Sequence, residues 1–318
     1  MYVVGIDLGG TNIAAGVVDE NYNIVGRGKI KTRAPRPAEE IADDMIAAVE
    51  MAISDAGLTK EDIEWVGVGA PGTINPITGV IGFSNNLQFN NVPFKSLLEE
   101  RFNAKFYIEN DANAAAFGEF LAGAGRGTKN LVAITLGTGV GGGIIVDGKL
   151  IVGSNFAGGE LGHVVIQKDG ELCTCGRKGC WEAYASATGL IRQTKQAMEK
   201  DKNSVMWEIC GGDINNVNGR TAFDAMRMGD KTGKEVVDNY IEYLACGIVN
   251  VINIFQPDVL CIGGGISKEG ETILEPIRKY VEYNVFSKNI DKQTVIKTAE
   301  LGNDAGIIGA AFLENLYK

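Results

Sequence analysis

The sequence has no excess of basic residues. It contains 30 lysines and arginines against 40 aspartates and glutamates, which gives a formal net charge of −10. An acidic balance of this size disfavours a general attraction to nucleic acid or to anionic membrane surfaces. We therefore expect neither a nucleic acid nor a membrane among the partners of the chain.

Long apolar runs and a secretion signal are also missing. The start, Met1 to Asp7, has no basic segment followed by an apolar run, and no stretch reaches the roughly 18 apolar residues that a membrane span requires. The expected location is therefore the cytoplasm. Without a secretion signal, the six cysteines are better interpreted as thiols or metal ligands than as a disulfide framework.

Two common nucleotide-binding motifs are absent or misleading. No GxxxxGK segment followed by serine or threonine occurs, which argues against a P-loop NTPase. The segment Gly137 to Gly142 matches GxGxxG, but the residues after it predict a strand, an Asp147-Gly148 turn and another strand. Because the dinucleotide motif requires a helix at that point, a Rossmann oxidoreductase is disfavoured.

The chain is long enough for two domains. Its 318 residues, 45% of them apolar, exceed one ordinary domain and provide a sizeable core, so a cleft between two domains is plausible. The alternation of strands and helices predicts an α/β protein with a mixed sheet. The patterns predict strands within 3–25, at 65–68, 105–108, 131–152 and 259–262, and helices over 38–56, from Pro93, from about Asp111, over 234–255 and over about 305–317.

A faint internal repeat links the two halves. Shifting the first segment by 128 residues aligns Ile6 with Ile134, Gly9 with Gly137 and Asp19 with Asp147. Chance could supply some of these matches. The pattern nevertheless suggests two related halves that each begin with a glycine-rich hairpin.

Three glycine clusters follow predicted strands. Asp7 precedes Gly9, Gly10 and Thr11, which together offer a carboxylate, bare amides and a hydroxyl to a magnesium-bound phosphate chain. Gly137, Thr138 and Gly139 form a second such surface, and Gly264 with Gly265 could lie against an adenosine. Singly, each cluster could be a simple turn. Together they indicate a nucleotide cleft that is split among several loops.

Asp111 lies between a predicted strand and an alanine-rich helix. It could be only the N-cap of that helix. It could equally be a general base that takes the proton of a sugar hydroxyl as this oxygen attacks a γ-phosphate. A helix N-terminus lowers the pKa of a carboxylate, so we expect Asp111 to be ionised.

The most specific pattern is a histidine followed by clustered cysteines. His163, the only histidine of the chain, precedes Cys173, Cys175 and Cys180, a ligand set typical of a tetrahedral structural zinc site. The alternatives are a strained Cys173–Cys175 disulfide or unrelated thiols. A closed metal site would fix Glu160 and Glu182, whose carboxylates suit adjacent sugar hydroxyls, whereas without the metal both would be ordinary surface charges.

These segments together resemble the repressor, open-reading-frame and kinase (ROK) family of sugar kinases and sugar-responsive regulators. The resemblance covers essentially the whole chain and is most specific over His163 to Glu182. It implies the actin-like ATPase fold, with two ribonuclease-H-like domains around a nucleotide and sugar cleft, assembled as a homodimer or homotetramer. We expect a small domain of residues 1–118 with 303–318, and a large domain of residues 119–302 that carries the zinc site.

The resemblance also implies roles for single residues. Asp111 would be the catalytic base, and Asp7 would lie near the magnesium of Mg-ATP. The sugar would be contacted by Asn86, Asn110, Asp111, Glu160, His163 and Glu182, and the phosphates by Gly9, Gly10, Thr11, Gly137, Thr138 and Gly139. His163 would use one ring nitrogen for zinc and the other for a sugar hydroxyl.

The expected function is therefore phosphorylation of a hexose at its 6-hydroxyl by Mg-ATP. Glucose is the first candidate, because the motifs are most similar to those of bacterial glucokinases. N-acetylmannosamine, N-acetylglucosamine, mannose, allose and fructose stay open, as does a sugar sensor without catalytic activity. Regulators of the family carry a DNA-binding segment before the Asp-Leu-Gly-Gly-Thr motif, which here begins at Asp7, so a repressor is not expected.

Overall fold

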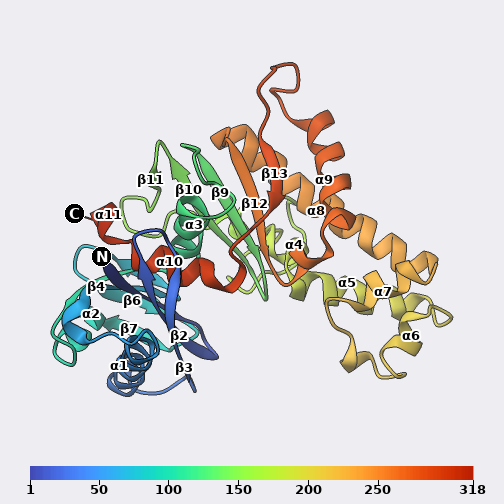
Figure 1. Ribbon diagram of the computed structural model, residues 1–318. Coiled ribbons are helices and arrows are strands. Elements are labelled where there is room, and N and C mark those ends of the chain that lie inside the picture. The colour runs from blue at the N-terminus through green and yellow to red at the C-terminus, as the bar shows by residue number, and fades with distance from the viewer. Residues whose placement is uncertain (318) are drawn as a thin grey trace. The chain divides into compact units, whose positions relative to one another are not determined.

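The glycine-rich opening folds into three antiparallel strands, of which the first two match the predicted range 3–25 and the third extends beyond it. In the computed structural model, which describes residues 1–317, they are β1 (Tyr2–Leu8), β2 (Asn12–Asp19) and β3 (Ile24–Lys31) (Figure 1). Ala15 of β2 pairs with Ile6 of β1 and with Gly28 of β3. Most of β1 is buried, which indicates that both faces of its sheet are covered.

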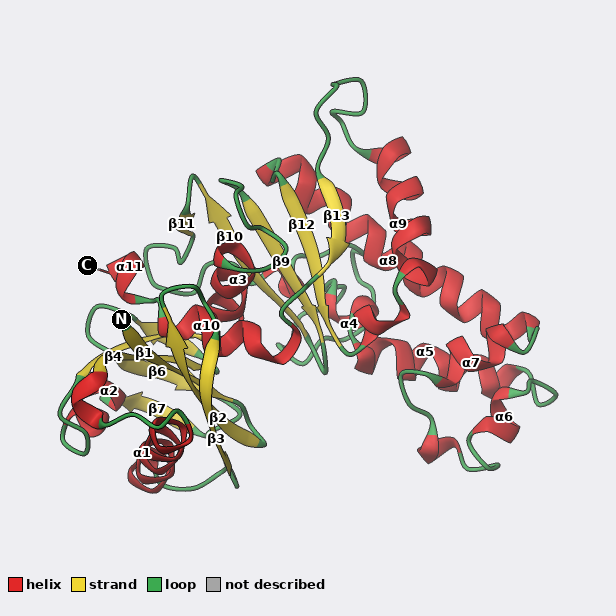
Figure 2. Ribbon diagram, viewed as in Figure 1, coloured by secondary structure: helices red, strands yellow, loops and turns green. Residues whose placement is uncertain are grey.

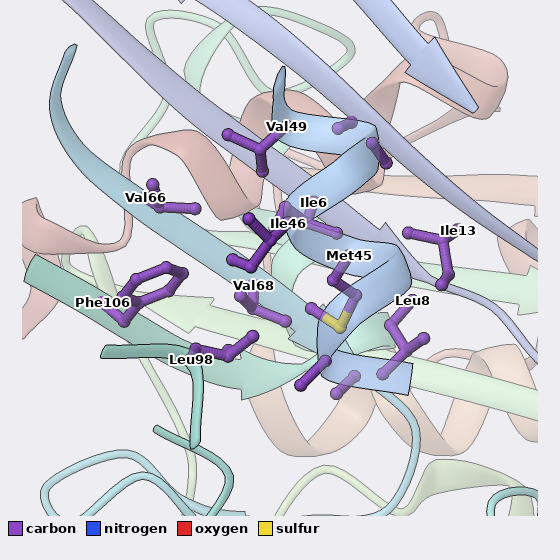
Figure 3. Close-up of a cluster of buried hydrophobic side chains, with 14 of the residues drawn as sticks. Ile6, Leu8, Ile13, Met45, Ile46, Val49, Val66, Val68, Leu98 and Phe106 are labelled. Carbon is purple, nitrogen blue, oxygen red and sulfur yellow. The ribbon is translucent and has the colours of Figure 1, made fainter. Parts of the chain in front are cut away.

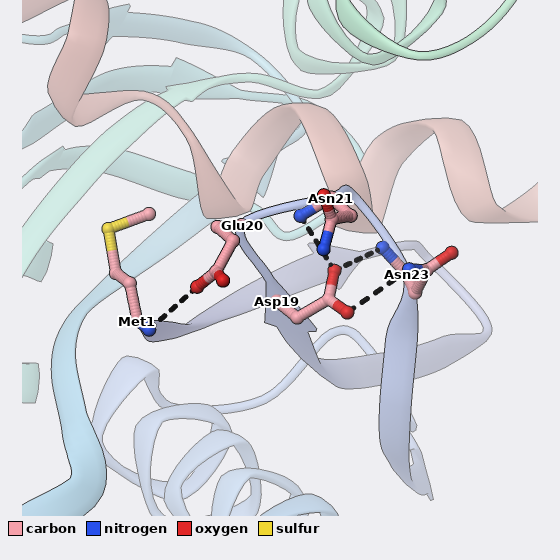
Figure 4. Close-up of polar contacts among 5 residues, drawn as sticks. All are labelled: Met1, Asp19, Glu20, Asn21 and Asn23. Atoms are coloured by element: carbon pink, nitrogen blue, oxygen red, sulfur yellow. Dashed lines mark hydrogen bonds and ion pairs between the residues drawn. The ribbon is translucent and has the colours of Figure 1, made fainter.

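The turn between β2 and β3 is fixed by its own side chains. Asp19 accepts hydrogen bonds from the amides of Asn21 (2.9 Å) and Asn23 (2.8 Å), and the Asn23 side chain donates to its second oxygen (Figure 4). Tyr22 adopts a positive φ of 66°. Such Asx turns are the reason that Asp and Asn predict a reversal at this point.

The first sheet is mixed, as predicted. Its order is β3-β2-β1-β4-β8, in which β4 (Ile63–Ala70) runs parallel to β1, and β8 (Lys105–Asn110) runs parallel to β4. Helix α3 (Asp111–Leu121) follows β8 without an intervening loop, so the strand end and the first helical turn form one junction. This junction places Asp111 where β8 leaves the sheet.

Helix α1 (Ala38–Asp55) covers one face of this sheet and confirms the helix predicted over 38–56. It presents Met45, Ile46 and Val49 to the core, where they lie among side chains of β1, β2, β4 and β8 (Figure 3). Each fully buried aliphatic side chain of this size stabilises the fold by about 1.5–3 kcal/mol. The chain leaves the helix through Gly57, which has a positive φ of 67°.

The predicted closing helix is in fact two helices, α10 (Ala305–Ala311) and α11 (Glu314–Tyr317) (Figure 2). The prediction of one helix was wrong because the chain turns at Phe312 and Leu313. Both of these side chains are buried, and the centre of the Phe312 ring lies 4.8 Å from that of the Tyr22 ring. Helix α10 packs back on the first sheet, as expected. A Cβ on Gly67 would meet the Ala310 carbonyl at 1.7 Å, so only glycine permits this contact.

The second sheet repeats the strand order of the first. It runs β11-β10-β9-β12-β13, with β9 (Leu131–Leu136), β10 (Val140–Val146), β11 (Lys149–Leu150), β12 (Val259–Gly264) and β13 (Val295–Thr298). The 128-residue shift carries β1 onto β9 and β2 onto β10. Asp147 and Gly148 both have positive φ, which confirms the predicted tight turn between β10 and β11. The internal repeat is therefore structural.

Several short elements were not predicted. A three-stranded sheet, β5-β6-β7, consists of strands with three to five residues each, too short for a clear alternation: β5 (Thr73–Asn75), β6 (Val80–Ser84) and β7 (Phe89–Val92). The remaining helices are α2 (Phe94–Glu99), α4 (Glu182–Ala185), α5 (Ala187–Lys200), α6 (Met206–Ile209), α7 (Thr221–Arg227) and α9 (Glu271–Asn284). Of these, only α2, which Pro93 precedes, was predicted.

The longest helix, α8 (Lys231–Phe255), extends the helix predicted over 234–255 by three residues at its start. Asp230 caps it by accepting a hydrogen bond from the Gly233 amide. Gln256, in the left-handed conformation, ends it before Pro257. Within residues 1–317, no helix is both long and apolar enough to cross a membrane.

By contacts between residues, the chain divides into two compact units. One consists of Met1–Ala133, Gly142–Gly159 and Ala299–Lys318, and the other of Ile134–Gly141 and Glu160–Thr298. The first thus includes residues 119–133 and 142–159, which lie beyond the predicted boundary at 118. One reason is that the buried Glu119 of α3 accepts hydrogen bonds from the amides of Ala124, Glu300 and Leu301.

Candidate functional site

His163 and the three clustered cysteines lie together in the second unit. Their ligand atoms are all within 4.8 Å of one another, with Cys173 Sγ 3.6 Å from His163 Nδ1 and Cys175 Sγ 3.6 Å from Cys180 Sγ. A tetrahedral zinc with Zn–S bonds of about 2.3 Å separates its sulfurs by roughly 3.8 Å. The donor set and its spacing therefore fit a zinc ion, whereas the three sulfurs are free thiols rather than disulfides.

The loop that carries the cysteines is held by its backbone. The Cys173 amide donates to the Arg177 carbonyl at 2.8 Å, and the Gly179 amide donates to the Glu171 carbonyl at 2.8 Å. Gly179 has a positive φ of 82°, and a Cβ there would meet the Gln167 carbonyl at 1.7 Å. The loop is thus a fixed hairpin, in which the glycines permit the turn that brings the sulfurs together.

Burial disfavours the ionised form of two of these thiols. It raises the pKa of Cys180 to about 12 and also raises the pKa of Cys173, whereas the hydrogen bond from the Arg177 amide lowers the pKa of Cys175. A metal binds thiolates, so a cation at this cluster would supply the charge that the buried sulfurs need in order to ionise.

Glu182, at the start of α4, connects the cysteine loop to a glycine turn of the same unit. Its Oε1 accepts a hydrogen bond from Thr174 Oγ1 at 3.0 Å, and its Oε2 accepts one from the Val140 amide at 3.0 Å. A Cβ on Gly139 would lie 2.3 Å from Oε2. Sequence reasoning missed Thr174 and Val140, although the position of Thr174 between two ligands was a usable signal.

The two glycine clusters of the second unit follow neighbouring strands, β9 and β12. The Gly137 carbonyl accepts a hydrogen bond from the Ala187 amide, and the Thr138 carbonyl accepts one from Thr188 Oγ1, so the start of α5 holds this turn. A Cβ on Gly264, which has a φ of 89°, would meet the Leu136 carbonyl at 2.3 Å. Both clusters expose backbone at the ends of adjacent strands, a typical setting for a phosphate or nucleoside.

In the first unit, Asp7 lies at the end of β1 and Asp111 at the start of α3, and the charge of Asp111 affects the ionisation of Asp7. Burial, followed by the nearby charge of Asp111, raises the pKa of Asp7 to about 6. Burial also raises the pKa of Asp111, while hydrogen bonds oppose the shift. The expectation that the helix N-terminus lowers the pKa of Asp111 was wrong, because loss of solvent outweighs the helix dipole.

Asn110 is the N-cap of α3, and Asp111 is the first helical residue. The Asn110 Oδ1 accepts hydrogen bonds from the amides of Ala112 (2.9 Å) and Asn113 (3.1 Å), and its Nδ2 donates to the Gly72 carbonyl. The capping function is therefore filled by the neighbour of Asp111. Asp111 Oδ1 accepts a hydrogen bond from the adjacent Ala112 amide at 2.9 Å.

The turn after β1 is closed by hydrogen bonds at Gly9 and exposes the two residues that follow. The Gly9 amide donates to the Asn12 carbonyl at 3.0 Å, and the Gly9 carbonyl accepts from Thr32 Oγ1 at 2.6 Å. Gly10 is exposed, and a Cβ there would meet no atom within 4 Å. Thr11 is also exposed, so the turn presents backbone and a hydroxyl to solvent.

The predicted site residues are divided between the two units. The first unit holds Asp7, Gly9, Gly10, Thr11, Asn110 and Asp111, with Asn86 exposed between β6 and β7. The second unit holds Gly137, Thr138, Gly139, Glu160, His163, Glu182, Gly264, Gly265 and the cysteines. Glu160 is exposed and precedes the short 3-10 turn Leu161–His163, where its carbonyl accepts a hydrogen bond from the His163 amide.

Comparison with known proteins identifies the family. The family model described as "ROK family" matches residues 3–315. The chain belongs to the ROK family. It is 37% identical to the glucokinase of Thermotoga maritima over 310 residues, which cover 97% of this chain and 96% of that protein. The actin-like ATPase fold expected from the sequence is confirmed.

Two further relatives of this ROK chain differ in what their names describe. The crystal structure of a ROK family glucokinase from Streptomyces griseus in complex with glucose and AMPPNP superimposes with a TM-score of 0.83 at 37% identity, and covers 98% of this chain and 99% of that one. The xylose repressor of Caldicellulosiruptor bescii is 29% identical over 293 residues, which cover 89% of this chain and 71% of the repressor. Family membership alone therefore does not fix the activity.

Proposed function

We propose that this ROK-family sugar kinase transfers the γ-phosphoryl group of Mg-ATP to the 6-hydroxyl of glucose. The observation that carries the proposal is the pair Asp7 and Asp111, two half-buried carboxylates at the ends of β1 and β8 whose pKa values are raised by loss of solvent. A raised pKa suits a general base that must accept a proton at neutral pH. Similarity to glucokinases over nearly the whole chain supports glucose as the sugar.

In the proposed reaction, Asp111 accepts the proton of the sugar 6-hydroxyl as that oxygen forms a bond to the γ-phosphorus. The bond between this phosphorus and the bridging oxygen breaks, and ADP leaves. The phosphate oxygens are proposed to lie against the turn at Gly9, Gly10 and Thr11 and the turn at Gly137, Thr138 and Gly139. The amides of Gly9 and Gly137 already donate within these turns, to the Asn12 and Gly139 carbonyls, so the amides proposed as phosphate donors are those of Gly10, Thr11, Thr138 and Gly139. Asp7 would face the magnesium that accompanies ATP.

For the sugar, we propose contacts from Asn86, Asn110, Glu160, His163 and Glu182. Nδ1 of His163 faces Cys173 Sγ, so its Nε2 is the nitrogen proposed for a sugar hydroxyl. Glu182 Oε1 accepts hydrogen bonds from Thr174 Oγ1 and Cys173 Sγ, whereas Oε2 accepts one from the Val140 amide and retains a second lone pair for a hydroxyl. Gly264 and Gly265 are proposed to lie against the adenosine.

The cation proposed for the His163 and cysteine cluster is a structural Zn²⁺. Four protein ligands would fill its tetrahedral coordination, which leaves no position for water and so no catalytic role for the ion. It would supply the charge that the buried thiols of Cys173 and Cys180 require. Its proposed effect on catalysis is indirect, through the positions of His163 and Glu182.

The decisive test replaces Asp111 with Asn. This substitution keeps the shape and removes the base, so we expect turnover to fall by about 100-fold or more while glucose binding, measured by calorimetry, stays within a few-fold of the wild type. Asp147→Asn, in the exposed turn after β10, is the control and should leave turnover unchanged. Near-normal turnover in Asp111→Asn would refute the role of the base.

The choice of sugar needs a separate measurement. A coupled assay of ADP formation with glucose, mannose, allose, fructose, N-acetylglucosamine and N-acetylmannosamine should give the highest kcat/KM with glucose. A higher value for another sugar would correct the substrate and leave the reaction class intact. Absence of ADP formation with every sugar, together with measurable sugar binding, would favour a sugar sensor.

A further inference from the structure

The strand end that leads to Asp111 carries a buried carboxylate that the proposed reaction does not use. Glu109, in β8, is 2% exposed and lies two residues before Asp111. Burial raises its pKa, and the hydrogen bonds that it accepts oppose the shift. Taking a carboxyl group out of water is unfavourable unless hydrogen bonds replace the lost solvent. Three donors supply these hydrogen bonds to Glu109.

Two of its donors belong to the junction between β8 and α3. Glu109 Oε1 accepts a hydrogen bond from the Asn110 amide at 2.7 Å and another from Asn113 Nδ2 at 2.9 Å. Asn110 caps α3, and Asn113 lies in its first turn. Oε1 therefore holds the cap and the first turn of the helix that begins with Asp111.

The third donor comes from the other end of the chain. The hydroxyl of Tyr317, in helix α11, donates to Glu109 Oε2. Of the three donors, it alone lies outside the segment from Glu109 to Asn113, so it is the contact that anchors this segment to a separate element. On the opposite side, Asn110 Nδ2 donates to the Gly72 carbonyl at 3.1 Å.

The orientation of Asp111 depends on the same contacts. The Ala112 amide donates both to Asn110 Oδ1 and to Asp111 Oδ1, at 2.9 Å in each case. A rotation of Asn110 would change how this amide is shared, and thereby the direction of the Asp111 carboxylate. Asn110 is connected to Glu109 through its own amide and through Asn113, whose amide donates to Asn110 Oδ1 and whose side chain donates to Glu109 Oε1.

We propose that Glu109 and Tyr317 are positioning residues for Asp111, and that the hydroxyl of Tyr317 fixes the Glu109 carboxylate so that the first turn of α3 presents its base in the reactive orientation. The inference rests on the proposed role of Asp111 as the base. It assigns a contribution to catalysis to helix α11, which touches neither proposed substrate. Small displacements of a reacting group can lower a rate by up to about 100-fold.

The test compares Tyr317→Phe with Tyr107→Phe. Tyr107 lies on the same strand as Glu109, and its hydroxyl donates at 3.5 Å to Glu314 of the same helix α11, without contacting Glu109. We expect Tyr317→Phe to lower kcat by roughly tenfold while the KM values for glucose and ATP change by less than about twofold, because orientation of the base affects the reacting complex rather than binding. In Tyr107→Phe, kcat should be unchanged.

A purely structural role of Tyr317 would give a different result. It would lower the melting temperature of both variants and leave kcat per folded molecule unchanged in both. Unchanged kcat in Tyr317→Phe, or an equal fall in both variants, would overturn the positioning role while an active wild type preserves the proposed function. A wild type without activity on any hexose would overturn the function and the inference together.

A conservative variant and a coupling measurement complete the test. Glu109→Gln keeps an oxygen for Asn110 and Asn113 and an amide that can donate to the Tyr317 oxygen, so kcat should stay within about threefold of the wild type. In a Glu109→Ala background, where Tyr317 has lost its partner, Tyr317→Phe should lower kcat no further. A full additional tenfold loss there would show that Tyr317 does not act through Glu109.

Discussion

At the scale of single residues, Asp111 shows how burial changes a prediction made from local sequence. The position at a helix N-terminus predicted a lowered pKa, whereas burial raises it. A base acts only when it is deprotonated, so a raised pKa moves the acidic limb of the pH–activity profile toward higher pH. We expect kcat/KM for glucose to fall, as pH decreases, at a higher pH than the usual aspartate value of about 3.9.

The measurement is kcat/KM for glucose across pH 4–9 in buffers of constant ionic strength. Asp7 and Asp111 interact, so the limb reports the pair rather than either residue alone. Repeating the profile with Asp7→Asn removes one of the two carboxyl groups, and we expect the limb to move toward lower pH. A limb that stays at the same pH in this variant would mean that another group limits activity.

Asp7 should also reduce the stability of the free protein. In the unfolded chain its carboxyl ionises at about pH 4, but in the folded chain its pKa is about 6. The folded state therefore binds more protons than the unfolded state between these values, so the stability contribution of Asp7 falls as pH rises from 4 to 6. Asp7→Asn should raise the free energy of unfolding at pH 7 by roughly 2 kcal/mol, with a smaller gain at pH 4.

Urea unfolding at both pH values, without magnesium or nucleotide, measures this difference. Asp19→Asn is the contrasting variant, because hydrogen bonds in the turn after β2 lower the pKa of Asp19. It should not stabilise the protein at pH 7. An equal loss of stability in both variants would contradict the burial argument for Asp7.

At the scale of elements, close approach between helix and sheet depends on glycine. Gly67→Ala would place a Cβ 1.7 Å from the Ala310 carbonyl, so α10 must move away from β4 or the strand must distort. The atoms that the new Cβ would meet belong to the backbone of α10, which cannot move aside as a flexible side chain would. We expect the free energy of unfolding to fall by about 3 kcal/mol or more.

Gly219→Ala is the matched control for this substitution. A Cβ on Gly219 would meet no atom within 4 Å, and its backbone requires no positive φ. Its effect on unfolding in urea should stay within about 0.5 kcal/mol. Similar losses in the two variants would show that the contact between α10 and β4 is more adaptable than its geometry implies.

Which elements the sequence predicted follows from how local their signals are. The hairpin of β1 and β2, helix α1 and the Asp147-Gly148 turn were predicted because their periodicity or turn residues lie within a few positions. The short strands β5, β6 and β7 and the break between α10 and α11 were not. The strands have only three to five residues each, too few for a clear alternation, and the break coincides with Phe312, whose partner Tyr22 is almost 300 residues away in the sequence.

The candidate site divides in the same way. The cluster of His163 and three cysteines was predicted because its residue types and spacing are typical of a zinc site, and the structure brings the four ligand atoms within 4.8 Å of one another. The connection of Thr174 to Val140 through Glu182 joins residues 34 positions apart, and the anchoring of Glu109 by Tyr317 joins residues 208 positions apart. Contacts of this kind leave no periodic signal in one sequence.

At the scale of the whole molecule, the metal cluster connects stability with the proposed sugar site. The cysteine loop reaches the turn at Gly139 through Glu182, and His163 is both a proposed ligand and a proposed sugar contact. Removal of the metal should therefore lower the melting temperature and weaken glucose binding together, each by a measurable amount.

Elemental analysis of the purified protein should give one zinc per chain, and dialysis against a chelator should remove it. Glucose affinity, measured by calorimetry on the metal-free protein at a temperature where it remains folded, should fall by about 10- to 100-fold and recover when zinc is restored. Cys210→Ser, at a buried cysteine outside the cluster, controls for general loss of a thiol and should retain its zinc.

If the metal-free protein has the same melting temperature as the zinc-bound protein and binds glucose as tightly, the metal contributes neither to stability nor to sugar binding. If stability falls while affinity is unchanged, His163 and Glu182 hold their positions without the metal, and the contacts of Glu182 with Val140 and Thr174 suffice to order that part of the site.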